Sequence, residues 1–262
     1  MSEYEAIELT RDGAIGHIAF DRPDAHNSLN EQMTGELVEA THDLVSDDDV
    51  RAIALSGNGP VFNTGADMTM LTGDGSDEPR IGSLASELHE FMSQLVRAPK
   101  PVVTGVGGVA AGGGVGPAVC GDIVLVSESA RFEFAYPRIG LSGDSGSTFF
   151  LPRLLGLRRA QELAFRDEPI GAEEAVDLDL ATEVVPDAEL DDRLTAEAER
   201  LADGPTQAYA ATKRLLWQSF DNSIDEQLAE EAETIAGLTN TEDFSRGHAA
   251  FGGDEEPDFT GN

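Results

Sequence analysis

Hydrophobic and polar residues alternate along the first half of the chain in the manner of strands and helices that follow one another. Short apolar or alternating runs predict strands at residues 7–10, 15–20, 50–55, 101–106, 123–126 and 131–134. Apolar positions at helical spacing predict helices over residues 30–45, with Ser28 or Asn30 as the N-cap, and over 81–96. The Asp12-Gly13 pair predicts a tight hairpin between the first two strands.

The second half of the chain has a different pattern. From Ser145 onward it is predicted to be nearly all helical, with one strand near residues 182–185. Residues 72–80 are rich in Gly, Asp, Ser and Pro and predict a mobile surface loop. Strand–helix alternation followed by helices indicates an α/β core with a helical C-terminal appendage. A chain of 262 residues forms one large domain, or one domain with a small appendage.

The charge of the chain is strongly negative and evenly distributed. Fifty acidic residues against seventeen basic ones give a net charge of −33, and only Lys100 and Lys213 are lysines. Acid spread over an otherwise globular pattern predicts a surface adapted to high salt, where like charges are screened. Because nucleic acids and anionic membranes require clustered Lys and Arg, the composition argues against both as partners.

Other features narrow the class of protein further. The polar, acidic start and the lack of any apolar run of about 18 residues predict a soluble, cytoplasmic protein without a signal peptide. The single cysteine, Cys120, lies in an apolar run and is interpreted as a buried small residue rather than a nucleophile. The five histidines lack the spacing of metal ligands, so no metal site is expected.

Two glycine motifs about fifty residues apart suggest a site for an anion. Residues 59–68 (GPVFNTGADM) and 112–116 (GGGVG) each follow a predicted strand and precede a predicted helix. Two N–H groups aimed at one point would form an oxyanion hole for a carbonyl oxygen. Two other interpretations remain open: glycines for close helix–strand packing, and a dinucleotide fingerprint formed by Gly105, Gly107 and Ala110.

Two acidic residues are candidates for chemistry. Asp144 lies in a loop of small residues (GLSGDSGS) after Ile139 and Leu141, where partial burial of its carboxylate would suit it to proton transfer. The alternative is that Asp144 caps the following helix, and the residues alone do not decide between the two. Asp67 is interpreted as a helix cap after the first glycine turn.

The chain resembles the crotonase, or enoyl-CoA hydratase/isomerase, superfamily over essentially its full length. The carrying segments share their order and spacing with that family; they are residues 21–30 (DRPDAHNSLN), 62–68 (FNTGADM), 100–103, 112–114, 122–124, 151–156 (LPRLLG), 172–175, 250–251 and 257–259. The resemblance implies a spiral core of ββα turns at residues 1–200 that binds acyl-CoA. It also implies a helical trimerisation region and tail at residues 201–262, in homotrimers or dimers of trimers.

The resemblance also implies roles for individual residues. The N–H groups of Ala66 and Gly113 would bind the thioester oxygen, and Asp144 would be the catalytic base, as in the isomerases of the family. Residues expected at the substrate are Ala25, His26, Gly65, Asp67, Met68, Gly114, Tyr136 and Phe251. Family hydratases carry glutamates at the positions of Gly116 and Tyr136, so ordinary hydration is disfavoured here.

The expected function is therefore an isomerase that shifts a double bond in an unsaturated acyl-CoA. The sequence is most similar to the ring-opening isomerase of phenylacetate degradation. Coenzyme A would be part of the substrate, and no further cofactor is expected. Hydration, another crotonase-type reaction, and non-catalytic acyl-CoA binding remain alternatives. Relatives carry lysines near the CoA where this chain has Asp24 and Asp254, so Arg22 and His26 are candidates to meet the phosphates.

Overall fold

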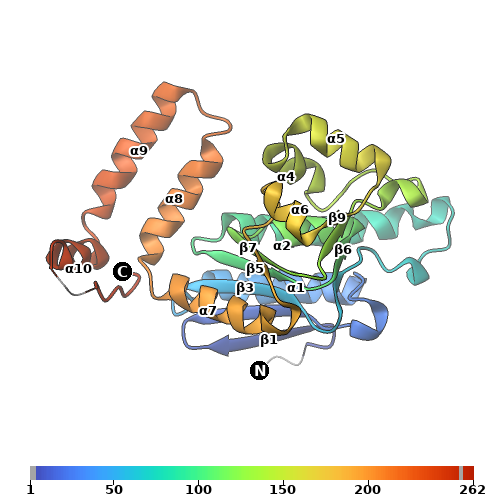
Figure 1. Ribbon diagram of the computed structural model, residues 1–262, viewed down its shortest axis with the longest axis horizontal. Helices are drawn as coiled ribbons and strands as arrows, with labels where there is room; N and C mark the ends of the chain where they lie inside the picture. The colour runs from blue at the N-terminus through green and yellow to red at the C-terminus, as the bar shows by residue number, and fades with distance from the viewer. Residues whose placement is uncertain (1–3, 254–255) are drawn as a thin grey trace.

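The computed structural model describes residues 4–253 and 256–262 and contains two β-sheets (Figure 1). The larger has the strand order β1-β2-β3-β5-β7-β10, and only β1 and β2 are antiparallel in it. Its strands are β1 (Ile7–Asp12), β2 (Ile15–Phe20), β3 (Ala52–Gly57), β5 (Val102–Val106), β7 (Ile123–Ser127) and β10 (Glu183–Val185). The smaller has the order β4-β6-β8-β9, with β4 (Val61–Asn63), β6 (Val109–Ala111), β8 (Arg131–Glu133) and β9 (Ile170–Gly171).

The chain visits the two sheets in turn and so forms a spiral. Strands β3, β5 and β7 of the larger sheet are each followed directly by a strand of the smaller one, β4, β6 and β8. Helices α2 (Glu78–Arg97) and α3 (Val115–Val119) return the chain to the larger sheet after β4 and β6. This is the α/β spiral expected from the sequence resemblance, and it places successive β-to-α turns beside one another.

Helices cover both faces of the larger sheet. Helix α1 (Glu31–Ser46) packs beside α2, and buried residues of both contribute to the main hydrophobic core. Helix α7 (Leu190–Ala202) covers the other face, where Leu190, Leu194 and Ala198 pack on Ala54 and Val103. The remaining helices of the core are α4 (Ser147–Leu154), α5 (Gly156–Arg166) and α6 (Ala172–Asp177).

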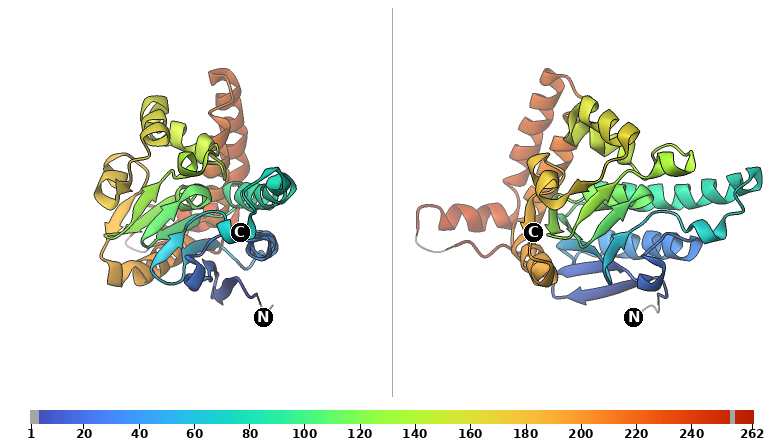
Figure 2. Two further views of the ribbon diagram at one scale, coloured as in Figure 1. Left: turned by 90° about the vertical axis from the view of Figure 1, so that its right-hand side faces the viewer. Right: turned by 45° about the vertical axis from the view of Figure 1, so that its right-hand side comes forward.

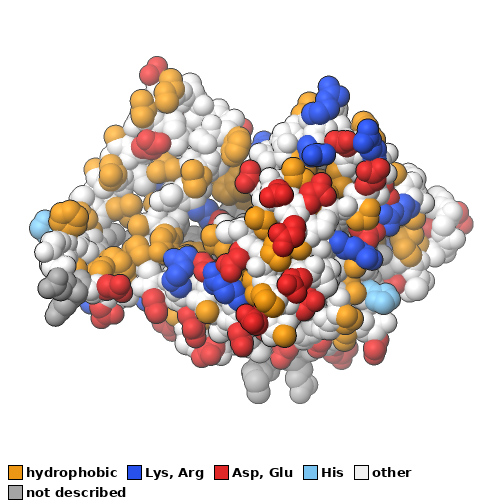
Figure 3. All heavy atoms as spheres, viewed as in Figure 1, with side chains coloured by type: hydrophobic (Ala, Val, Ile, Leu, Met, Phe, Trp, Pro, Cys, Tyr) orange, Lys and Arg blue, Asp and Glu red, His pale blue; other side chains and the backbone are white. Residues whose placement is uncertain are grey.

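Three C-terminal helices project from this core. Helices α8 (Thr206–Gln218) and α9 (Ile224–Leu238) form an antiparallel pair beside the core, and α10 (Glu242–Ala250) lies at its lower end (Figures 1 and 2). Large apolar side chains on this pair and in the turn that joins it are 54–70% exposed; they are Leu216, Phe220, Ile224, Leu228 and Ile235. The space-filling view shows hydrophobic side chains over this part of the molecule (Figure 3). Exposed apolar patches of this kind are typical of interaction surfaces.

Both lysines of the chain are buried. The Lys100 ammonium donates to the carbonyl oxygens of Leu44 and Asp47, each at 2.9 Å. Burial lowers the pKa of Lys100. Lys213 on α8 forms an ion pair with Asp122 at 2.8 Å and donates to the Leu95 carbonyl at the end of α2, so it holds α8 against the core. Acidic side chains are scattered over the visible surface (Figure 3).

The strongest sequence predictions are confirmed. The β1–β2 hairpin turns at Gly13, where φ is 55°. Helix α1 is capped by the Asn30 side chain, which accepts from the Met33 N–H at 2.9 Å. No described helix is both long and apolar enough to span a membrane.

Some predictions are wrong. The expected surface loop ends at the 3₁₀ turn Gly75–Asp77 rather than at residue 80, and α2 starts at Glu78, because Asp74 caps that turn and Pro79 occupies the first turn of the helix. Strands β4, β6 and β9 were missed. The dinucleotide interpretation fails because β6, rather than a helix, follows Gly105 and Gly107.

Candidate active site

The first glycine motif is held so that the Ala66 N–H points away from the neighbouring segment at Leu29. Ala66 forms a parallel bridge with Leu29. The Leu29 N–H donates to the Gly65 carbonyl and the Asp67 N–H donates to the Leu29 carbonyl, both at 2.8 Å. Successive peptide groups of an extended chain face opposite sides, so the Ala66 N–H faces the other side of this segment.

The second glycine motif lies on that other side. A Cβ built on Gly65 would come within 2.6 Å of the Gly113 nitrogen, and one built on Gly113 would lie 3.8 Å from the Ala66 nitrogen. Gly113 is in the 3₁₀ turn Gly112–Gly114, which leads into α3, and N–H groups in a first turn have no intrahelical partner. Across the described residues, neither the Ala66 nor the Gly113 N–H donates to a backbone carbonyl in a turn, loop or cap. The two amides thus lie close together and lack such an acceptor, as the predicted oxyanion hole requires.

Two fully buried asparagines hold these loops in place. The Asn63 side chain accepts from the Gly65 N–H at 2.8 Å and donates to the Asn27 carbonyl at 2.7 Å. The Asn27 side chain donates to the Asn58 and Val61 carbonyls at 2.9 and 2.7 Å. Both asparagines are 0% exposed. Neither asparagine was predicted as a site residue from the sequence, because an isolated Asn gives no indication that it is buried. Each nevertheless lies within a segment that carries the family resemblance.

Gly114, the third glycine of the run, also makes a close approach. A Cβ on it would lie 2.3 Å from the Asn63 carbonyl oxygen. Close packing of the two loops thus accounts for a glycine at this position, as one of the interpretations left open by the sequence expects.

Asp144 lines a large cavity and is bonded to a histidine. Its Oδ1 lies 2.5 Å from Nε2 of His89 on α2, and the side chains are 37% and 53% exposed, respectively. The cavity has a volume of about 1070 Å³ and extends between α2, α4 and α8. Its apolar wall includes Met92, Val96, Phe149, Phe150 and Trp217. The helix-cap alternative for Asp144 is wrong, because Gly146 is the N-cap of α4 and the Asp144 side chain makes no cap bond.

The loop that carries Asp144 packs directly on α3. A Cβ on Gly116 would come within 1.7 Å of the Ser145 carbonyl oxygen, so position 116 has no room for any side chain. Tyr136 is buried beside the same loop, with its hydroxyl 3.4 Å from Oγ of Ser145. Burial raises the pKa of Tyr136, so the phenol stays protonated at neutral pH. The glycine run, α3 and the Asp144 loop therefore form one packed unit.

The segment before α1 lies against the first glycine motif. Asp67 accepts from the Thr69 N–H at 3.1 Å, as its predicted capping role requires, and pairs with Arg22 at 2.9 Å. The hydroxyl of Thr69 and the Arg22 pair lower the pKa of Asp67. Arg22 also donates to the Ser28 carbonyl, so both terminal amino groups of its guanidinium are hydrogen-bonded within the chain. This leaves His26, which is exposed and left-handed with a φ of 54°, as the freer candidate for a phosphate.

The other expected substrate-binding residues divide into two groups. Ala25, in the short turn before His26, and Met68, which is 48% exposed, flank the glycine motif. Phe251 does not join them within this chain, since it is 91% exposed at the end of α10. Asp24 is exposed, and Asp254 lies outside the described residues.

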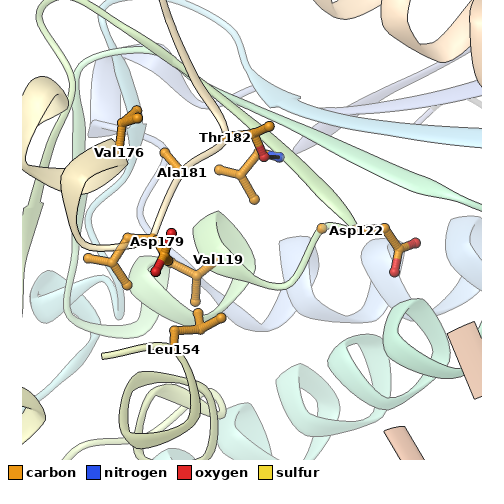
Figure 4. Close-up of a pocket in the computed structure, with 10 residues that line it drawn as sticks. Val119, Asp122, Leu154, Val176, Asp179, Ala181 and Thr182 are labelled. Atoms are coloured by element: carbon orange, nitrogen blue, oxygen red, sulfur yellow. Dashed lines mark hydrogen bonds between the residues drawn. The ribbon is translucent and has the colours of Figure 1, made fainter. Parts of the chain in front are cut away.

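Other chemistry is not supported. Within residues 4–253 and 256–262, no group of three or more His, Cys, Asp or Glu side chains is placed to hold a metal. Cys120 is buried, as predicted, and burial raises the pKa of its thiol to about 12, so it does not form a nucleophilic thiolate. A second cavity of about 380 Å³, between Val119, Leu154 and Thr182, contains none of the predicted site residues (Figure 4).

Comparison with known proteins shows the family to which this chain belongs. Residues 10–262 match the family model described as enoyl-CoA hydratase/isomerase. A probable enoyl-CoA hydratase of Rhodobacter capsulatus is 38% identical over 98% of this chain and 99% of its own. The 1,2-epoxyphenylacetyl-CoA isomerase of Escherichia coli is 33% identical over 93% of this chain and 94% of its own. The crystal structure of a putative enoyl-CoA hydratase from Streptomyces coelicolor superposes with a TM-score of 0.92 at 30% identity, covering 100% of this chain and 96% of that one. With its spiral fold and paired glycine motifs, this chain belongs to the enoyl-CoA hydratase/isomerase family.

Proposed function

We propose that this protein is an acyl-CoA isomerase that shifts a double bond through an enolate, with Asp144 as its one acid–base group. The observation that carries the proposal is the position of Asp144. Its carboxylate lines the cavity, and its loop packs on α3, the helix that follows the turn containing Gly113. A base next to an oxyanion hole is what proton abstraction from the carbon beside a thioester carbonyl requires.

The proposed reaction has two proton transfers. The thioester oxygen accepts the N–H groups of Ala66 and Gly113, which stabilise the negative charge as it develops, each by roughly 3 kcal/mol. Asp144 takes a proton from C2 of a 3-enoyl thioester, and the electron pair is delocalised into the enolate. The carboxyl then returns the proton at C4, so that the double bond ends between C2 and C3. Coenzyme A enters as part of the substrate.

Hydration is the second candidate, because the relative from Rhodobacter is named a probable hydratase. Position 116 has no space for a glutamate unless the Asp144 loop moves, since its Cβ would overlap the Ser145 carbonyl. Position 136 carries a buried phenol whose pKa is raised, which cannot act as a carboxylate base toward water. Both facts support isomerisation over hydration.

The test is a direct comparison of the two reactions. We expect isomerisation of 3-enoyl-CoA to be faster than hydration of crotonyl-CoA at matched concentrations in high salt, because one acid–base group serves the first reaction and not the second. Each is followed by the appearance of its own product. Faster hydration would refute the isomerase function and favour the second candidate.

The cavity beside Asp144 supports a sizeable acyl group as the substrate. Its apolar wall contains the Phe149 ring stacked on Trp217 at 5.7 Å, with Phe150 edge-on to Trp217 at 5.9 Å. Trp217 comes from α8, so the C-terminal region would complete the acyl site. An epoxyphenylacetyl-CoA belongs with 3-enoyl-CoA in the substrate panel, since a relative is named for that substrate.

We further propose that the chain assembles as a homotrimer or a dimer of trimers, adapted to high salt. The exposed apolar side chains of α8 and α9 support such an interface, and a neighbouring copy would bring Phe251 to a substrate. Burial of both lysines supports the salt adaptation, because it leaves arginine as the long cationic side chain available to the described surface.

Salt should control assembly and CoA binding together. Each chain carries a net charge of −33. The Debye length, over which these charges repel one another, is roughly 30 Å at 0.01 M salt but about 3 Å at 1 M. We expect the oligomer and the affinity for CoA both to weaken as KCl is removed and to recover when it returns. Sedimentation and CoA titration from 10 mM to molar KCl measure this. An intact trimer with unchanged CoA affinity in 10 mM salt would contradict the prediction.

A further inference from the structure

His89 contacts the proposed catalytic carboxylate but has no part in the reaction as written above. It projects from α2, which is distant in sequence from Asp144, and its Nε2 lies 2.5 Å from Oδ1 of Asp144. Both side chains line the cavity. An ionised carboxylate only accepts hydrogen bonds, so Nε2 must carry the hydrogen in this pair.

The hydrogen bond from His89 engages only one of the two carboxylate oxygens of Asp144. Oδ1 accepts from His89, whereas Oδ2 accepts no hydrogen bond from the residues that the structure describes. Asp144 follows a stretch without regular secondary structure (residues 141–143), and its side chain makes no cap bond that would hold it otherwise. The His89 ring, on a long helix packed against the core, is thus the described side-chain partner that fixes the direction of this carboxylate.

We propose that His89 is a positioning residue: its Nε2–H holds Oδ1 of Asp144 so that Oδ2 faces the substrate and keeps the abstracted proton for return to the same molecule. This inference rests on the isomerase function proposed above. In the step itself, Oδ2 takes the proton from C2 and later gives it to C4, while His89 neither gains nor loses a proton. Without the bond the carboxyl turns more freely, and its proton exchanges with water before it is returned.

The test compares His89→Leu, which lacks a donor, with His89→Gln, whose amide N–H can restore the bond. In His89→Leu we expect kcat to fall roughly 10- to 100-fold, the usual cost of a small misplacement of a catalytic group, with KM within about twofold. Isomerisation in D₂O should place more deuterium in the product of His89→Leu than in that of the native enzyme. His89→Gln should recover most of both properties, and His42→Leu, an exposed histidine on α1, should match the native enzyme.

Different results would contradict the positioning role of His89 and the isomerase function. Unchanged kcat and unchanged deuterium content in His89→Leu would overturn it, as would failure of His89→Gln to recover in a folded protein. Long-range ¹H–¹⁵N NMR on the native chain supplies a readout without turnover: a His89 ring protonated only at Nδ1 would also overturn it. A native enzyme inactive on every 3-enoyl thioester, yet with its Nε2–H in place, would instead overturn the isomerase function, and the proposed role of His89 with it.

Discussion

Asp144→Asn is expected to lower turnover of 3-enoyl-CoA by about 10²–10⁴, which is the usual contribution of a general acid–base group. Asparagine has nearly the same shape as aspartate and its oxygen can still accept from Nε2 of His89, so the loop and the cavity should keep their form. The amide cannot take a proton from C2. Steady-state kinetics in high salt measure the loss, and titration with a saturated acyl-CoA should show that binding remains.

A control separates a catalytic effect from a charge effect. Asp43→Asn removes one negative charge from the exposed face of α1 and should leave turnover unchanged. If Asp144→Asn turned over substrate at the native rate, another group would have to be the base and the proposed mechanism would fail.

Gly65→Ala should lower turnover nearly as much as Asp144→Asn does, although the Asp144 carboxylate stays in place. The added Cβ would meet the Gly113 nitrogen at 2.6 Å, between backbones that cannot simply rotate away. Either glycine loop must then shift, which would separate the Ala66 and Gly113 amides. Loss of a donor from an oxyanion hole costs roughly 10²–10³ in kcat, and we expect a fall of that order.

The matched control for this variant is Gly73→Ala. Gly65 and Gly73 have φ values of +79° and +83°, so both substitutions strain a left-handed backbone. A Cβ on Gly73 has no neighbour within 4 Å. Comparing kcat/KM and melting temperature of the two variants isolates the contact with Gly113. Equal activity in both would show that the paired amides do not carry the reaction.

The sequence predicted well those elements whose signals are local. The β1–β2 hairpin depends on Asp12-Gly13 and the start of α1 on Asn30, and both signals lie within a few residues of the structure that they determine. The central strands β3, β5 and β7 of the larger sheet were found because each is buried on both faces and reads as an apolar run. Strands β4 and β6 were missed since they are short and lie next to glycines that resemble turns.

The features of the site likewise fall into those that the sequence shows and those that only the structure shows. The sequence by itself determined the glycine motifs, the acid at position 144 and the absence of acids at 116 and 136, because these are properties of residue type and order. Only the tertiary structure decided that Asp144 bonds to His89 rather than capping α4, and that Gly116 packs on Ser145. These contacts join segments of separate elements, one pair of them 55 residues apart in sequence, and depend on how the spiral stacks its turns and where α2 crosses them. No local pattern encodes that stacking, since it is set by the packing of buried side chains throughout the core.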